Sequence, residues 1–420
     1  MTLYPLIPGA KLVRFVFEES SRPLSRVVTF GIISGIAGGG ILAAINQGAQ
    51  MAAGSLDIQP LLLFSGLLAL FLYSKRYSLI NAVMAVEEML QAVRNRVAGK
   101  IADSELEAME RIGPSYVFNR LSQDTILISD SAHVIFASFG ALIMLVFSTI
   151  YIAIISFEGF IMTLSAISLG VITFLSQRRA IIEAVRSATS SEVEFLASVE
   201  QSLNGFKEIK LNRGKANDLL RSQAAIGGTL ERAKKRAGRS QTFAMMFSQA
   251  FFYALLGIVV FVWPVVMDES TETVIKVTAT ILFIIGPIDL VVGSMPLFME
   301  ADVAVENLKE LERRLEAGVT KTSAKPLDPA APFVGLQIKD VKYRYPGDHD
   351  ETAFTLGPIN LEVTPGEILF IVGGNGSGKS TLLKILTGLY YPTTGEVLVD
   401  GSLLERSDYP QYRQSFSAIF

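Results

Sequence analysis

The chain has 420 residues, of which half are hydrophobic and only 18% are charged, and its mean hydropathy is +0.42. Soluble proteins usually carry about 25% charged residues, so this composition excludes an ordinary water-soluble globular protein. The absence of cysteine excludes disulfides, thiolate metal sites and cysteine nucleophiles. A net charge of −3 gives no sign of a nucleic-acid partner.

The apolar excess lies before residue 300, in stretches that approach the roughly 20 residues needed by a membrane-spanning helix. Six spans are predicted, at residues 27–45, 58–73, 134–155, 160–176, 243–267 and 274–298. The second and fourth are short as purely apolar runs, so we expect their helices to continue into polar sequence. A six-helix bundle in the lipid bilayer is therefore predicted, as a transmembrane domain over residues 1–316.

Basic residues fix the expected orientation of this bundle. The two long loops, 74–130 and 177–241, carry seven and thirteen Lys and Arg residues, whereas the short connections 46–57, 156–159 and 268–273 carry none. Because cytoplasmic loops are enriched in Lys and Arg, both long loops are predicted to lie in the cytoplasm. The residues after the last span then lie there too, and the chain is expected to be a multi-pass protein of the cytoplasmic (inner) membrane.

Each long loop has the pattern of two helical extensions joined by a short transverse segment. Gly113 and Gly205 interrupt the helical periodicity at the two turns. Within the last span, Asp289 is an intramembrane carboxylate, which is costly and usually faces a cavity or a partner. It either contacts a polar substrate or lies at the cytoplasmic interface. His133, at a span boundary, is expected to be an interfacial polar residue rather than a ligand.

After the bundle the composition changes. Residues 317–334 contain three prolines and small polar residues, which is typical of a linker. From residue 335 the sequence is β-rich: residues 336–345 alternate at period two, and 359–363 form a second predicted strand. The apolar run 368–372 is predicted to be the strand that leads into the next motif.

That motif fits G-x-x-x-x-G-K-[ST], the phosphate-binding loop of P-loop nucleotidases, with a helix-like run starting at Thr381. Its residues are Gly373, Gly374, Asn375, Gly376, Ser377, Gly378, Lys379 and Ser380. Glycines let backbone N–H groups turn inward around phosphate oxygens, Lys379 would pair with the β and γ phosphates, and Ser380 would ligate Mg²⁺. The alternative is a glycine-rich turn that matches by chance. Binding of ATP with Mg²⁺ is the prediction.

A family resemblance now emerges. The order of six spans, a linker, a strand ending in Tyr343-Arg344-Tyr345-Pro346, a Pro-Gly-Glu turn and GGNGSGKST resembles an ATP-binding cassette (ABC) exporter half-transporter. Residues 205–212 and 412–420 look most like the cyclic-peptide and siderophore exporters of the pyoverdine type. The resemblance implies ATP-driven export of a peptide-like or siderophore substrate by a dimer, which we expect to be a homodimer.

The resemblance also implies particular roles. Tyr345 would stack on the adenine, with a strand-edge tyrosine packed on the linker as the alternative. Thr381 would be a further phosphate contact, and residues 113–121 and 204–213 resemble the two coupling helices that dock on the nucleotide-binding domains. The fold expected is a multi-domain membrane protein: an all-α six-helix exporter bundle followed by a partial α/β P-loop nucleotide-binding domain, residues 335–420.

The sequence departs from this family after the loop. The 420 residues contain no signature like Leu-Ser-Gly-Gly-Gln, no strand that ends in Asp-Glu and no switch histidine, so no catalytic residue is predicted. We therefore expect a C-terminally truncated nucleotide-binding domain that binds ATP without hydrolysing it. The alternative is a non-hydrolysing membrane sensor or regulator. A membrane-bound P-loop kinase would need an acceptor pocket that the sequence does not reveal.

Overall fold

The computed structural model describes most of the chain, namely residues 9–51, 58–319, 333–345 and 354–419. Contacts between residues divide the chain into two compact units. The first unit comprises residues 1–92 and 123–307, and the second comprises residues 93–122 and 308–420.

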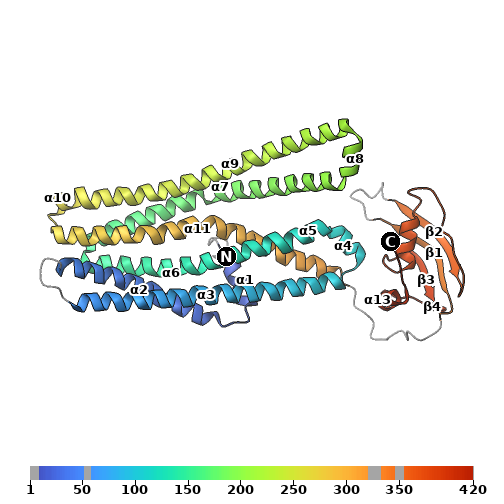
Figure 1. Ribbon diagram of the computed structural model, residues 1–420, viewed down its shortest axis with the longest axis horizontal. Coiled ribbons are helices and arrows are strands. Elements are labelled where there is room, and N and C mark those ends of the chain that lie inside the picture. The colour runs from blue at the N-terminus through green and yellow to red at the C-terminus, as the bar shows by residue number, and fades with distance from the viewer. Residues whose placement is uncertain (1–8, 52–57, 320–332, 346–353, 420) are drawn as a thin grey trace. The chain divides into compact units, whose positions relative to one another are not determined.

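The first unit is a bundle of long helices that run lengthwise beside one another (Figure 1). The bounds are α1 Ala10–Glu19, α2 Leu24–Met51, α3 Ile58–Asp103, α6 Thr125–Ile155, α7 Phe157–Asn204, α8 Phe206–Leu211, α9 Arg213–Gly257, a π-helical segment Ile258–Val262, α10 Trp263–Met267 and α11 Thr271–Ala317. A helix satisfies its backbone hydrogen bonds internally, as a lipid environment requires. The all-helical prediction for this region is confirmed.

Five of the described helical stretches are long and apolar enough to cross a membrane. They are Leu24–Gly48, Ile58–Asp103, Pro114–Ile155, Arg213–Met267 and Thr271–Ala317. The fourth predicted span, 160–176, lies in α7, whose apolar stretch Phe157–Thr173 is shorter than those five. As expected, α3 and α7 continue far beyond their apolar parts into polar sequence.

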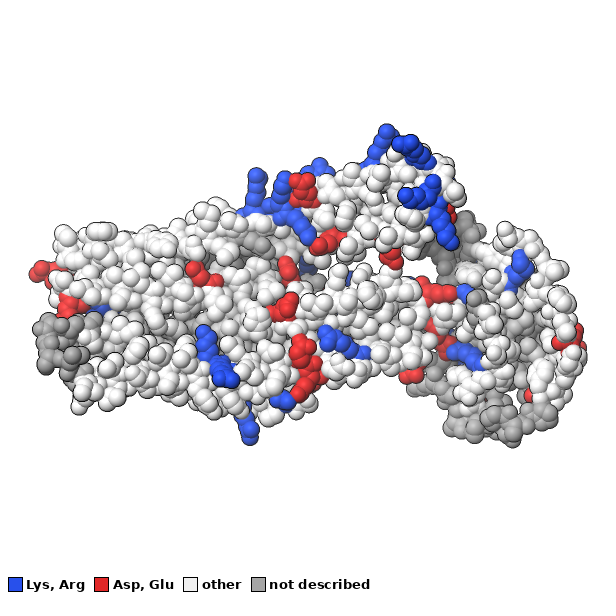
Figure 2. All heavy atoms as spheres, viewed as in Figure 1, with Lys and Arg blue, Asp and Glu red and all other residues white. Residues whose placement is uncertain are grey.

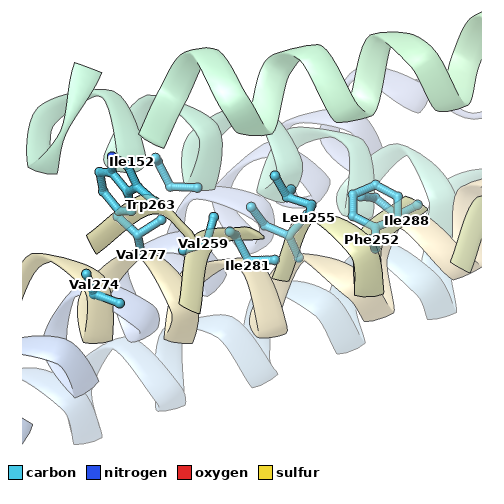
Figure 3. Close-up of a cluster of buried hydrophobic side chains, with 10 residues drawn as sticks. Ile152, Phe252, Leu255, Val259, Trp263, Val274, Val277, Ile281 and Ile288 are labelled. Atoms are coloured by element: carbon cyan, nitrogen blue, oxygen red, sulfur yellow. The ribbon is translucent and has the colours of Figure 1, made fainter. Parts of the chain in front are cut away.

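A buried apolar cluster joins α6, the α9–α10 region and α11 (Figure 3). Its members are Ile152, Phe252, Leu255, Val259, Trp263, Val274, Val277, Ile281, Ile284 and Ile288. Trp263 is the one tryptophan of the chain and is 1% exposed. Such interdigitated side chains hold a bundle together mainly by close packing.

Small residues allow α2 to approach α6 closely. A Cβ atom added at Gly35 would lie 2.5 Å from Cγ2 of Ile143 and 3.0 Å from the backbone oxygen of Gly140. Only glycine leaves room for that approach, which is the usual way in which membrane helices pack tightly. The backbone of α2 is therefore fixed against α6 at this level.

The second predicted loop is a helical hairpin with a short transverse helix, as expected. Helix α7 ends at Asn204, and α8 follows after Gly205. The side chain of Asn212 then caps α9 by accepting hydrogen bonds from the N–H groups of Gly214 and Lys215 at 3.0 and 3.1 Å. Exposed basic side chains recur along α9, and Figure 2 shows several of them in blue on this hairpin. The placement of this hairpin in the cytoplasm stays a prediction, which rests on these same basic residues.

The second unit contains a four-stranded antiparallel sheet in the order β2-β1-β3-β4. Its elements are α4 Leu106–Ile112, α5 Pro114–Asn119, the π-helical segment Arg120–Asp124, β1 Leu336–Arg344, β2 Thr355–Val363, α12 Lys379–Leu386, β3 Thr394–Val399, β4 Ser402–Leu403, α13 Tyr409–Tyr412 and a 3₁₀ turn at Arg413–Ser415. Strand β1 confirms the predicted strand at 336–345, and the second predicted strand is the end of β2. Gly113, with φ 88°, separates α4 from α5.

One predicted strand is wrong. Residues 368–372 have no regular structure, and the side chains of Ile368, Phe370 and Val372 are 79%, 81% and 88% exposed. A strand needs neighbouring strands to pair its backbone N–H and C=O groups, and the four described strands pair only with one another. Most of the predicted linker 317–334, and Pro346 of the motif that ends the first strand, lie outside the described residues.

Candidate nucleotide-binding site

The phosphate-binding motif forms a loop directly before α12. Gly376 and Gly378 have φ angles of 78° and 92°, in the left-handed region that L side chains rarely adopt. A Cβ atom at Gly378 would in addition lie 2.6 Å from Cδ1 of Leu356. Gly376 and Gly378 are therefore required by the backbone path, which explains these two positions of the pattern found in the sequence.

Lys379 is the first residue of α12, and its side chain folds back across the loop. Its Nζ donates hydrogen bonds to the carbonyl oxygens of Gly373 and Gly374, at 2.9 and 2.7 Å. The ammonium group thus lies over the loop, beside the N-terminus of a helix that itself favours negative charge. A phosphate chain is the ligand that this combination of fixed N–H groups, helix end and cation suits best.

The remaining motif residues are open to solvent. Asn375, Ser377 and Ser380 are exposed, and Ser380 lies in the first turn of α12. Among the described residues no group of three or more His, Asp or Glu side chains could hold a metal ion. A site made of one hydroxyl together with phosphate oxygens and water fits Mg²⁺, which keeps several waters and binds nucleotide phosphates.

Thr381 and Tyr345 lie together. The side chain of Thr381 is buried, and its Oγ1 is 3.0 Å from the hydroxyl oxygen of Tyr345. The hydroxyl of Thr381 is therefore engaged with Tyr345, whereas the family resemblance implies a phosphate contact. Tyr345 is half-buried and makes edge-on ring contacts with Tyr343 and Tyr390, at centroid distances of 5.1 and 5.8 Å.

The structure adds residues to this site that sequence reasoning missed. Lys384 lies near the end of α12, and its Nζ donates a hydrogen bond of 2.8 Å to the hydroxyl of Tyr390. Burial, and then a hydrogen bond with Glu110, raises the pKa of Tyr390 above its ordinary value, so that its hydroxyl stays protonated. The aromatic pair at 390–391 that follows the helix was a possible signal, but Glu110 is 280 residues away from Tyr390 in sequence.

Comparisons with known proteins agree with this geometry. Residues 356–420 match the family described as ABC transporter. The chain is 28% identical over 405 residues to the ATP-binding protein SyrD of Pseudomonas syringae pv. syringae, which covers 93% of this chain and 70% of that protein. It is 26% identical over 225 residues to an ATP-dependent lipid A-core flippase of Paraburkholderia xenovorans, covering 53% of this chain and 37% of the flippase.

A third relative matches a shorter part of the chain. The alpha-hemolysin translocation ATP-binding protein HlyB of Escherichia coli O157:H7 is 34% identical over 122 residues, which is 29% of this chain and 16% of that protein. Together these observations describe a chain with membrane-length helices and a phosphate-binding loop in a segment that matches the ABC transporter family. The chain as a whole is similar to ABC exporters.

Proposed function

We propose that this chain is an ABC half-transporter that works as a homodimer in the cytoplasmic (inner) membrane and uses ATP to export a peptide-like or siderophore substrate. The observation that carries the proposal is the phosphate-binding loop, with Lys379 bonded across it, on a chain whose described residues include five membrane-length helices. A P-loop on such a chain couples a nucleotide to a movable bundle.

The proposed nucleotide site uses the residues in the following way. Lys379 would exchange the carbonyl oxygens of Gly373 and Gly374 for the β and γ phosphate oxygens of ATP, which are stronger acceptors because they are charged. Ser380 would hold Mg²⁺, and the bound ion neutralises phosphate charge. Tyr345 would offer its ring to the adenine, with its hydroxyl anchored on Thr381.

The proposed substrate class is supported by the similarity to SyrD and by the two sequence segments that look like cyclic-peptide and siderophore exporters. Polar side chains inside the bundle are compatible with a polar cargo. The carboxylate of Asp289 accepts a hydrogen bond of 3.3 Å from Gln249 on α9, so the intramembrane acid has a protein partner. A cationic group of a substrate would compete with Gln249 for the same oxygen.

We further propose that the 420-residue chain by itself binds ATP without turning it over. Its sequence after the loop contains no Asp-Glu strand end that would supply the Mg²⁺ carboxylate and the general base. A nucleotide-binding membrane sensor would bind ATP in the same way but would move no substrate.

Binding of a fluorescent ATP analogue to the purified chain tests the proposal. Lys379→Ala should weaken binding about tenfold or more, because a hydrogen bond to a charged group contributes about 1.5–3 kcal/mol. Lys342→Ala is the matched control, since this exposed lysine lies on β1 away from the loop. Full affinity in Lys379→Ala would refute the site. Vanadate-sensitive ATP hydrolysis by the purified chain would refute the proposal that it only binds.

A further inference from the structure

Helix α4 is built into the nucleotide-binding segment although it belongs to the first long loop of the sequence. Leu106 packs against the buried core of the second unit, which includes Ile338, Tyr343 and Tyr390. The carboxylate of Glu105 is buried and paired with the guanidinium of Arg413, whose Nε also donates to the carbonyl oxygen of Gly388 at 2.7 Å. Helix α4 is thus held by apolar contact and by charge.

A second carboxylate of α4 closes a triangle of hydrogen bonds. Oε1 of Glu110 accepts from Nζ of Lys384 at 2.8 Å, and the hydroxyl of Tyr390 donates to the other carboxylate oxygen. Lys384 also donates to the Tyr390 hydroxyl at 2.8 Å and lies 4.5 Å from the ring centroid. Every pair in this set of three is bonded, so moving one member disturbs both others.

In this triangle the carboxylate of Glu110 faces the ammonium group of Lys384, which has the opposite charge. Burial acts to raise the pKa of Glu110, but the hydrogen bonds from Lys384 and Tyr390 and the charge of Lys384 outweigh it, so the pKa lies below its usual value. Glu110 is therefore an anion at neutral pH. On the same helix, burial and then Glu107 raise the pKa of Tyr343, the ring on which Tyr390 stacks at 4.8 Å.

The triangle is joined to the nucleotide site by two short paths. Lys384 and Lys379 are carried by the same eight-residue helix α12, about 7.5 Å apart along its axis at 1.5 Å per residue. The ring of Tyr390 meets the ring of Tyr345 edge-on at 5.8 Å, and Tyr345 is bonded to Thr381 on α12. A displacement of α12 by phosphate binding must therefore alter the contacts of Glu110.

Resting on the proposed function, we propose that Glu110 is a positioning residue for nucleotide binding, which acts through Lys384 and Tyr390 and links the phosphate-binding loop to the first long loop of the chain. The family resemblance implies a coupling helix at 113–121. Just before that segment, Glu105 and the α4 residues Leu106 and Glu110 contact the nucleotide-binding segment.

Nucleotide affinity of the full chain in detergent or nanodiscs provides the first test, with a fluorescent ATP analogue as the probe. Glu110→Gln should weaken binding about fivefold or more, the lower end of ordinary coupling between sites. The charge-reversed pair Glu110→Lys with Lys384→Glu should recover part of the loss. Glu316→Gln is the matched control: it removes an ion pair with Lys100 in the same unit, away from the loop.

Chemical labelling of a cysteine placed on α5 provides a second test. The effect of ATP on this labelling would not depend on Glu110 if Glu110 only stabilised the fold. The chain has no cysteine, so Phe118→Cys, at a position whose native side chain is 70% exposed, introduces a single thiol beside α4. Coupling is reciprocal, so ATP should change its alkylation rate, and Glu110→Gln should remove that change.

Different results would contradict the proposed function and the proposed role of Glu110. Absence of ATP binding by the parental chain contradicts the proposed function. Intact ATP binding with unchanged affinity in Glu110→Gln overturns the role of Glu110 and leaves the proposed function standing. A lower melting temperature of Glu110→Gln, with an unchanged effect of ATP on labelling, also overturns it, because Glu110 would then only stabilise the fold.

Discussion

The hydroxyl of Tyr345 lies 3.0 Å from the hydroxyl of Thr381, the third residue of α12. A residue at the end of the first strand of the sheet is thereby tied to the helix that starts at the phosphate-binding loop. One hydrogen bond thus connects Tyr345 to the helix that carries Lys379 and Ser380.

This relationship separates two roles of Tyr345. Tyr345→Phe keeps the ring and removes the bond to Thr381, whereas Tyr345→Ala removes both. If the ring stacks on adenine, Tyr345→Ala should weaken binding of the fluorescent ATP analogue by about 1–2 kcal/mol or about tenfold, and Tyr345→Phe by much less. Equal affinity in Tyr345→Ala and the parental chain would support the alternative of a strand-edge tyrosine that only packs.

The close approach of α2 and α6 leads to a stability prediction. Gly35→Ala adds one methyl group 2.5 Å from Cγ2 of Ile143, so the helices must move apart at a cost of about 1–3 kcal/mol. Gly66→Ala on α3 is the control, because nothing lies within 4 Å of its added Cβ atom. Thermal unfolding in detergent should show a lower melting temperature for the first variant alone.

The apolar cluster around Trp263 makes a second stability prediction. Ile281 is 1% exposed and its neighbour Leu282 is 52% exposed. Ile281→Ala should destabilise the bundle by about 2–5 kcal/mol through the cavity that it leaves, and Leu282→Ala by far less. Because Trp263 is the one tryptophan, its fluorescence emission during denaturation reports directly on the unfolding of this cluster. Equal effects of the two substitutions would contradict the packing described.

The triangle of Glu110, Lys384 and Tyr390 predicts a dependence on pH. The pKa of Glu110 is lowered from its usual 4.5 in the folded chain, so its contribution to stability is complete above 4.5 and is lost as the pH falls through the lowered value. The side chain is 43% exposed, so solvent screening keeps this contribution small.

Hydrogen exchange of the α4 backbone measures this loss. Protection of residues 106–112, corrected for intrinsic rates, should fall below pH 4.5 in the parental chain. In Glu110→Gln it should be lower at neutral pH and should fall less on acidification than in the parental chain. A parallel acid response in both chains would assign the effect to other groups.

The sequence predicted those structural features that depend on residues close together in the chain. Period-two alternation located β1, the motif glycines located a loop whose φ angles require them, and Gly113 and Gly205 marked real helix ends. The membrane helices followed from apolar length alone, although the apolar part of α7 is shorter than that of the other five.

Features that depend on distant partners could not be predicted. Residues 368–372 have the composition of a strand, but composition cannot supply the neighbouring strands that would pair with them. The bond of Thr381 to Tyr345 depends on a rotamer, and Glu110 meets Lys384 across 274 residues of sequence. The resemblance implied a docking helix at 113–121, and the contacts of Leu106 and Glu110 in α4 lie just before it.

The exposed run 368–372 has a consequence for any measurement of oligomeric state. The side chains of Ile368, Phe370 and Val372 are apolar and open to solvent, and the backbone of the run is outside the sheet, which is the combination that recruits strands from other molecules. Self-association of the purified chain through this run would grow with concentration and would have no fixed stoichiometry. A dimer seen by light scattering therefore counts as the transporter dimer only if it persists in Phe370→Lys, which blocks this adhesive segment and leaves the bundle unchanged.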